Sequence, residues 1–244
     1  MLKILAIGSL ILAQQINTGH YRHVYSGGGP STPTYVGSAV NGEAGNIVGL
    51  VMTITYTPAA AGHALYIFAA VGTGTITSLT DSAGSPSVVT SPVTWNVANG
   101  SGVYESWRES GAATGSHTIT LNVASGSTYG VLYVVELSNS SAAGNTSISS
   151  VGNSSANPIP CGSLTTSSGS IALAFGYVFD AAVTLSGGSG PPSFTFPTPS
   201  GSGLAYAGME YSGATIATTY TISSGFVPTS TGDSYFCYAL EAKP

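Results

Sequence analysis

The chain has 244 residues, of which 43% are hydrophobic and only 5% are charged, and its formal net charge is -5. Clustered Lys and Arg are lacking, which excludes a nucleic-acid binder that neutralises phosphates and argues against an amphipathic helix on a membrane surface. The hydrophobic fraction is sufficient for a folded core. With 33 glycines, 13 prolines and many Ser and Thr residues, the composition is typical of β-rich extracellular proteins.

Residues 1–16 form an apolar segment. A charged start followed by an apolar run is typical of a secretory signal, but this run is short and residues 11–13 make a poor cleavage site. The run is also too short for a transmembrane span, which needs about 20 apolar residues. Two hypotheses stay open: a cleaved signal, or a retained arm buried against the domain or a partner subunit. The large side chains of this arm are Leu2, Ile4, Leu5, Ile7, Leu10, Ile11 and Leu12.

Residues 17–41 have the composition of a linker, because the glycines and prolines of residues 27–34 favour flexibility and oppose a helix. His20 and His23 are close in sequence, but no Cys or acidic residue nearby would complete a metal-ligand set. We interpret them as part of a polar connector.

Residues 42–244 alternate apolar or β-branched runs with turn residues, which is the pattern of a β-sandwich. No window after the N-terminal run has the apolar stripe of a helix. Residues 81–84, with Asp first and Gly last, are typical of a β-turn. The expected strands are 47–56, 64–71, 75–80, 93–97, 103–107, 118–123, 130–137, 159–165, 171–179, 194–196, 204–211, 219–222 and 235–240.

The strand pattern repeats once along the chain. Residues 64–68 match 171–175, and the segments 117–120 and 132–136 match 219–222 and 235–241. Two copies are too few for a solenoid. The simplest explanation is one sandwich whose two halves each contribute strands to both sheets, and two separate small domains are the alternative. We therefore expect an all-β protein, an antiparallel, jelly-roll-like β-sandwich built from two similar halves.

Four segments, residues 65–71, 76–84, 133–138 and 238–244, resemble a family of Ser/Thr/Gly-rich β-sandwich modules. These modules occur in secreted bacterial surface proteins and in phage structural or fibre proteins. The resemblance covers about residues 45–244, and the two cysteines and residues 1–41 depart from it. It implies a presented or assembled surface module on a virion or outside the cell, and it transfers no functional residue.

Paired carboxylates would be needed for glycoside hydrolysis. In an alternating strand Glu105, Trp107 and Glu109 share one face, but Trp107 stands where sandwich-type glycosidases have Asp, so we expect a solvated strand face. Glu136 and Glu241 end apolar strands at equivalent points of the two halves, where we expect their carboxylates to contact water or a neighbouring backbone. The candidate acids are Glu105, Glu109, Glu136, Glu210 and Glu241.

Other chemistry has weaker support. A Gly-x-Ser-x-Gly motif is lacking, and His63 and His117 lie far in sequence from any Ser or Asp partner, so we expect neither a hydrolase triad nor any other enzyme activity. Calcium is a weak alternative, because Asp81, Asp180 and Asp233 occupy predicted turns. Asp is also a common turn residue, so we expect no metal and no cofactor.

The two cysteines, Cys161 and Cys237, leave two alternatives open. An even count in an exported protein suggests a disulfide. Their apolar strand contexts equally suit free buried thiols.

Two classes of function follow from the sequence. The first is a non-catalytic structural or adhesive surface protein, either a phage virion component of the head-decoration or tail-fibre type or a secreted cell-surface module, with other subunits as partners in a homo-oligomer. The second is a carbohydrate-binding module whose exposed aromatic platform is Trp95, Tyr104 and Trp107.

Overall fold

The structure is a computed structural model that describes residues 31–46, 51–97, 100–124, 126, 128–154, 159–179, 183–185, 194–202, 205–224, 226–228 and 233–244. The expected arm at residues 1–16 and the first part of the expected linker lie outside these residues. Thr32–Pro244 forms one compact unit. The described residues contain no helix, and therefore no helix able to cross a membrane.

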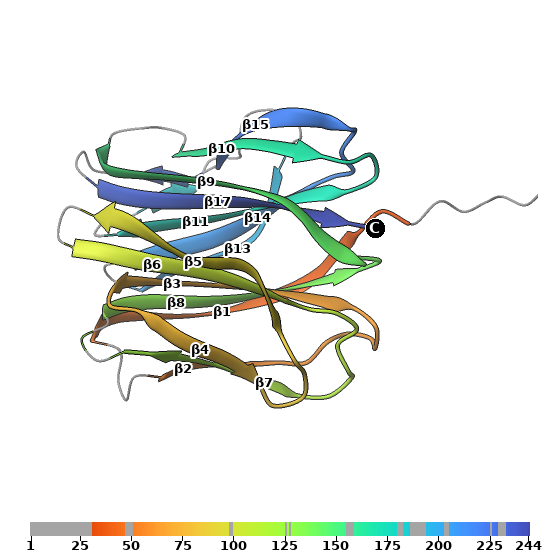
Figure 1. Cartoon of the computed structure of the whole chain (residues 1–244), viewed down its shortest axis with the longest axis horizontal. Coiled ribbons are helices and arrows are strands. Elements are labelled where there is room, and N and C mark those ends of the chain that lie inside the picture. Colours follow the sequence, from red (N-terminus) through yellow and green to blue (C-terminus); the bar gives the residue numbers. More distant parts are fainter. Residues whose placement is uncertain are drawn as a thin grey trace, which may run out of the picture. The chain divides into compact units, whose positions relative to one another are not determined.

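The described residues form antiparallel strands (Figure 1). Those of the first half are β1 Thr34–Asn46, β2 Val51–Tyr56, β3 Ala64–Thr73, β4 Ile76–Asp81, β5 Ser87–Val97, β6 Gly100–Glu109, β7 His117–Val123 and β8 Thr128–Ser138. Those of the second half are β9 Ala142–Ser154, β10 Ile159–Thr166, β11 Ile171–Phe179, β12 Val183–Leu185, β13 Phe194–Ser202, β14 Ala205–Ser212, β15 Thr218–Ser224, β16 Phe226–Pro228 and β17 Asp233–Lys243.

Each half has the topology of a jelly roll. In the first half, a large sheet of order β1-β8-β3-β6-β5 is covered by a small sheet of order β2-β7-β4. In the second half, the large sheet has the order β13-β14-β11-β17-β9 and the small sheet pairs β10 with β15, while β12 pairs with β16. Most successive strands alternate between two sheets, except that the neighbours β5 and β6, and likewise β13 and β14, pair within one large sheet. The last strand of each half returns beside the first, as in a jelly roll.

The two large sheets face each other. Alternation along the central strand β3 places Tyr66 and Phe68 in the core between the halves, whereas Leu65 and Ile67 pack against the small sheet of the first half. Ser106 donates a hydrogen bond to the Tyr238 hydroxyl across the same boundary, at 3.2 Å. The layers are therefore small sheet, large sheet, large sheet and small sheet.

The expected all-β, antiparallel sandwich of two similar halves is confirmed. The expectation that each half contributes strands to both sheets of one sandwich is wrong, because no sheet of the described residues combines strands of both halves. Each half builds its own sandwich of a large and a small sheet, and the second half also contains the separate β12–β16 pair. The aromatic core between the large sheets joins the two halves into one unit.

The expected linker is too long at its C-terminal end, because β1 begins at Thr34 and pairs with β8. The strand β9, at Ala142–Ser154, is the first strand of the second half and corresponds to β1; it was also not predicted. Both are edge strands rich in Gly, Ser and Asn. Their backbone pairing comes from a neighbouring strand, so an apolar pattern of their own is not required.

Candidate functional site

Two buried glutamates, Glu136 and Glu241, occupy corresponding places in the two halves. Glu136 lies in β8 opposite Leu65 of β3, and Glu241 lies in β17 opposite Ala172 of β11. Each is at most 1% exposed and accepts hydrogen bonds from the loop that leads from the small sheet back to the large one. The expected equivalence of these two residues is confirmed, and each contacts backbone.

Glu136 holds the loop between β2 and β3. Its Oε1 accepts a hydrogen bond from the Ala59 amide at 2.9 Å and contacts Nδ1 of His63, while its Oε2 accepts from the Tyr56 hydroxyl at 2.7 Å. Burial alone would raise the pKa of Glu136, but the hydrogen bonds from these three groups outweigh burial and lower it.

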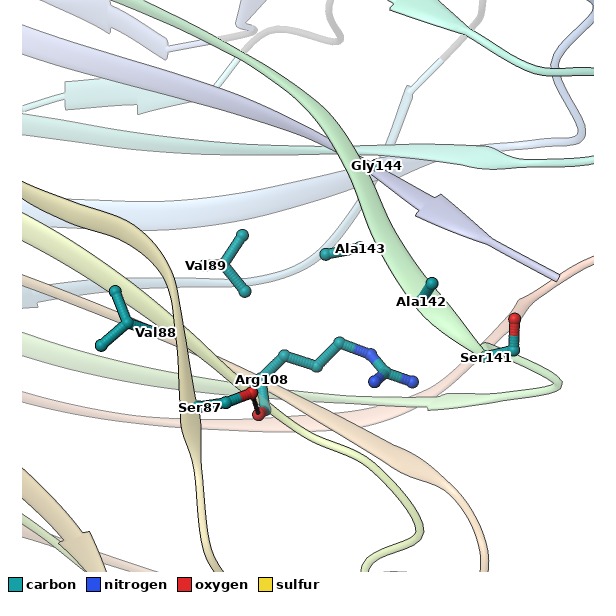
Figure 2. A pocket seen from close by; sticks show the side chains of 8 residues that line it. All are labelled: Ser87, Val88, Val89, Arg108, Ser141, Ala142, Ala143 and Gly144. Carbon is teal, nitrogen blue, oxygen red and sulfur yellow. Dashed lines mark hydrogen bonds between the residues drawn. The ribbon is translucent and has the colours of Figure 1, made fainter.

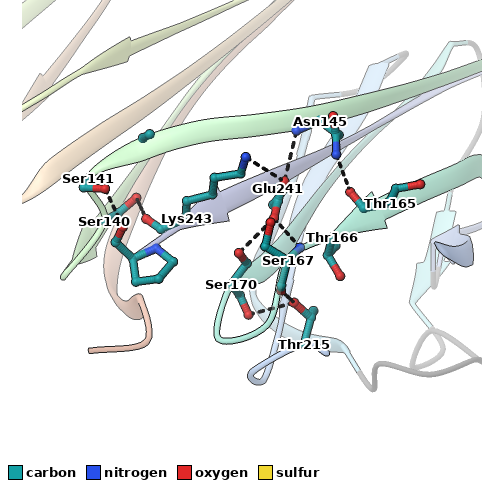
Figure 3. Close-up of polar contacts among 12 residues, drawn as sticks. Ser140, Ser141, Asn145, Thr165, Thr166, Ser167, Ser170, Thr215, Glu241 and Lys243 are labelled. Atoms are coloured by element: carbon teal, nitrogen blue, oxygen red, sulfur yellow. Dashed lines mark hydrogen bonds and ion pairs between the residues drawn. The ribbon is translucent and has the colours of Figure 1, made fainter. Parts of the chain in front are cut away.

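Glu241 holds the loop between β10 and β11 (Figure 3). Its Oε1 accepts from the Ser167 amide at 2.6 Å and from the Ser170 hydroxyl at 2.9 Å, and its Oε2 accepts from the Asn145 amide at 3.2 Å. Lys243 Nζ lies 3.7 Å from Oε2. Burial raises the pKa of Glu241, but the amide and hydroxyl donors outweigh it, so the net shift is downward.

An edge-strand glycine makes room for each of these networks. A Cβ on Gly37 of β1 would lie 2.8 Å from the hydroxyl of Tyr56, the partner of Glu136. A Cβ on Gly144 of β9 would overlap the Glu241 carboxylate. Both glutamates therefore act as structural anchors that the two halves share.

A third group of ionisable side chains, Asp81, Glu109 and His117, occurs in the first half. Asp81 ends β4, Glu109 ends β6 and His117 begins β7, so the group joins the small sheet to the large one. His117 Nδ1 lies 2.6 Å from Asp81 Oδ2 and 3.9 Å from Glu109 Oε1. One ligand atom from each residue lies within 4.8 Å of the other two.

These three side chains are buried together. The side chains of Asp81 and His117 are 0% exposed, and that of Glu109 is 6% exposed. Burial and the neighbouring Asp81 raise the pKa of Glu109 to about 7. Burial lowers the pKa of His117, but its hydrogen bonds to Asp81 and to the Ala113 carbonyl outweigh this, so the net shift is upward. The group can hold a shared proton or a divalent cation.

Sequence reasoning did not predict this group. It placed Asp81 in a turn, Glu109 on a solvated face and His117 without a partner. The solvated face is wrong, because Glu105 is 7% and Glu109 is 5% exposed. The cause is the small sheet, which covers this face of β6 and includes Trp107 in its core.

A groove of about 340 Å³ lies between residues 87–89 and residues 141–144 (Figure 2). Arg108 lines it and donates from Nη2 to the Ser140 carbonyl at 2.7 Å. Its guanidinium also stands over the Tyr66 ring, 5.6 Å from the centroid. Among the described residues no carboxylate lies within 4 Å of this guanidinium. The groove could accept a small anion.

Two of the three residues of the expected aromatic platform, Tyr104 and Trp107, are buried. Tyr104 is 0% and Trp107 is 4% exposed, because their strand is central and covered on both faces. The side chain of Trp95 lies outside the described residues. Of the expected calcium ligands, Asp180 and the side chain of Asp233 also lie outside them, as does the side chain of Glu210.

Cys161 of β10 and Cys237 of β17 form a disulfide with a Cα–Cα distance of 4.8 Å. Of the two alternatives left open by the sequence, the bridge is therefore the one observed. It links the small and large sheets of the second half. Disulfides persist in oxidising compartments, so the bridge indicates an oxidising, extracellular type of location.

These features define an all-β protein made of two jelly-roll halves with shared glutamate anchors, a disulfide and one buried acid–histidine group. Comparison of the chain with protein-family models, curated proteins and solved structures finds no match.

Proposed function

We propose that the chain is a non-catalytic structural or adhesive surface protein, a virion component of the head-decoration or tail-fibre type. A secreted cell-surface module is the second form of the same proposal. The observation that carries it is the joining of two jelly rolls through a continuous aromatic core, because this makes a rigid block from a single chain. Jelly rolls serve as building units of viral capsids, and this support is an analogy of architecture.

Three further observations support a surface role. Glu136 and Glu241, which sequence reasoning treated as candidate acids, hold loops in place. The disulfide suits exposure outside the reducing cytosol. Charged residues make up 5% of the chain, so its polar surface consists mainly of hydroxyl, amide and backbone groups. In an assembly, we expect other copies of this chain to be the partners.

Immunogold electron microscopy tests the proposal. Antibodies raised against residues 32–244 should label the outer surface of intact virions or, for the second form, of intact cells. Antibody that has first been absorbed with the purified protein is the control. Gold particles confined to the cytosol would contradict both forms of the proposal.

A further inference from the structure

We propose that Asp81, Glu109 and His117 bind one divalent ion of the Zn²⁺ type, which ties the two sheets of the first half together. One imidazole nitrogen and two carboxylates form a donor set that suits a borderline divalent ion. Calcium prefers six to eight oxygen ligands, so this set with its nitrogen donor does not suit it. The proposal does not depend on the proposed surface role.

A buried oxygen of Glu109 that has no hydrogen-bond partner among the described residues points to a cation. Glu109 is 5% exposed, and within the described part of the chain its Oε2 has no hydrogen-bond partner. An ionised carboxylate oxygen that is buried without a donor is costly. A metal ion between Glu109 and Asp81 would remove both this cost and the repulsion between the two carboxylates.

The orientation of His117 fits metal binding. Its Nε2 lies 3.0 Å from the Ala113 carbonyl, which can only accept, so Nε2 carries a proton. The other nitrogen, Nδ1, faces the carboxylates, and an ion would displace the proton that Nδ1 shares with Asp81 and take its lone pair. Histidine ligands in metal sites are commonly held in this way, with the second ring nitrogen donating to a backbone carbonyl.

The distances within the group are close to those of a site. Zn–N and Zn–O bonds of about 2.0–2.2 Å in tetrahedral geometry place two ligand atoms roughly 3.3 Å apart. The distances of His117 Nδ1 to Asp81 Oδ2, 2.6 Å, and to Glu109 Oε1, 3.9 Å, lie on either side of this value. Changes of about 0.6–0.7 Å would bring these two separations to the tetrahedral value, and the ligand atoms of Asp81 and Glu109 already lie within 4.8 Å of each other.

The backbone approaches this group closely. Asp81 Oδ1 accepts from the Ala83 amide at 3.1 Å, which shapes the turn after β4. A Cβ on Gly84 would overlap the Glu109 carboxylate. The glycine thus lets the turn close over the carboxylate and shield it from water.

The fold itself does not require these acidic residues. Ala112 exchanges two backbone hydrogen bonds with residues 62 and 63, and Thr215 does the same with residues 169 and 170, so Ala112 and Thr215 correspond. Glu109 lies three residues before Ala112, and Ser212 lies three residues before Thr215, so Ser212 is the counterpart of Glu109 in the second half. The second half instead links its two sheets by the disulfide between Cys161 and Cys237. An ion in the first half would supply the equivalent link.

The test is a titration of the full-length protein with Zn²⁺ after treatment with EDTA, by calorimetry and thermal unfolding at neutral pH. We expect one ion per chain and a rise in melting temperature of roughly 5–10 °C at a free ion concentration a hundred times Kd. Binding should be lost in Glu109→Gln and His117→Gln. It should persist in Glu105→Gln, which changes a buried glutamate of the same strand face outside the group.

A second control addresses the N-terminal histidines. The double variant His20→Asn/His23→Asn should bind Zn²⁺ as the wild type does, and loss of binding there would overturn the proposal. No saturable binding by the wild type, or unchanged binding by Glu109→Gln, would also overturn it. If the variants at residues 109 and 117 do not fold, nitrogen NMR of the wild type decides. Zn²⁺ must shift the Nδ1 resonance of His117, and an unchanged resonance would sink the idea.

Discussion

The rings of Phe68 and Phe175 stack on each other, with centroids 5.5 Å apart and planes inclined by 7°. Phe68 lies in β3 and Phe175 in β11, the middle strands of the two large sheets. Phe68 lies three residues after Leu65, which pairs with Glu136. Phe175 lies three residues after Ala172, which pairs with Glu241. Phe68 and Phe175 therefore occupy equivalent positions in the two halves and contact each other at the boundary, as equivalent residues do at the interface of a two-fold symmetric dimer.

Truncation of either ring should destabilise both halves. Phe68→Ala should lower the free energy of unfolding by about 3–5 kcal/mol, because it removes buried apolar contacts and leaves a cavity. Urea unfolding followed by circular dichroism measures this. Ile216→Ala, at a side chain that is 65% exposed, is the control and should change stability by less than about 0.5 kcal/mol. A loss below about 1 kcal/mol for Phe68→Ala would contradict the importance of this boundary.

Acid should weaken the loop anchors. The pKa values of Glu136 and Glu241 are lower in the folded state, so the folded protein binds fewer protons than the unfolded chain. Their stabilisation is complete above the unfolded value of about 4.3 and is lost as the pH falls through the folded value. Glu241→Gln should therefore cost about 1–3 kcal/mol at neutral pH. The difference from wild type, measured by urea unfolding at several pH values, should shrink below about pH 4, and a constant difference would refute this account.

Removal of the disulfide should destabilise the second half. In the second half, Ala172 and Ala174 occupy the positions that Leu65 and Ile67 occupy in the first half. The two sheets of the second half therefore bury less apolar surface against each other. Closing a loop between residues 76 positions apart contributes about 4 kcal/mol in the chain-entropy model. The double variant Cys161→Ala/Cys237→Ala should lose a comparable amount in urea unfolding. Its stability should not respond to dithiothreitol, whereas that of the wild type should fall, and equal responses would rule out the bridge.

Deletion of residues 1–16 should impair assembly without unfolding the domain. The residues after this segment have a linker composition, and the compact unit begins at Thr32. Its apolar side chains would contribute about 25 cal/mol for each Å² buried at an interface. Sedimentation should show a smaller oligomer for the deletion variant, with an unchanged β spectrum. A natural protein whose N-terminus by mass spectrometry lies at Gln14 or later would show that a signal is cleaved, which would contradict a retained arm.

Many strands could be predicted because their signal is local. The apolar run of residues 64–71 predicted β3, and the repeat predicted β11, the equivalent strand of the second half. The edge strands β1 and β9 could not be predicted, because their Gly- and Ser-rich residues acquire strand structure by pairing with β8 and β17. The equivalence of Glu136 and Glu241 was visible in the repeat, but the loop amides that they bind were not.

The buried group at Asp81, Glu109 and His117 had no signal in the sequence. Its residues are spread over three strands of two sheets, and no motif spacing relates them. Only the jelly-roll path, which brings the end of β4 beside the start of β7 and over β6, places them together. A search for it from sequence would have required the sheet topology first.

The sequence by itself determined the all-β class, the two similar halves and the low-charge polar surface, because alternation, turn residues and composition act within a few residues of the chain. The tertiary structure decided which strands share a sheet, which faces are covered and which acids meet. Tyr104 and Trp107 illustrate the difference: their strand was predicted, but their burial depends on two sheets built from distant residues. Pairing between such residues depends on loop closure and on packing of both faces, which no local pattern encodes.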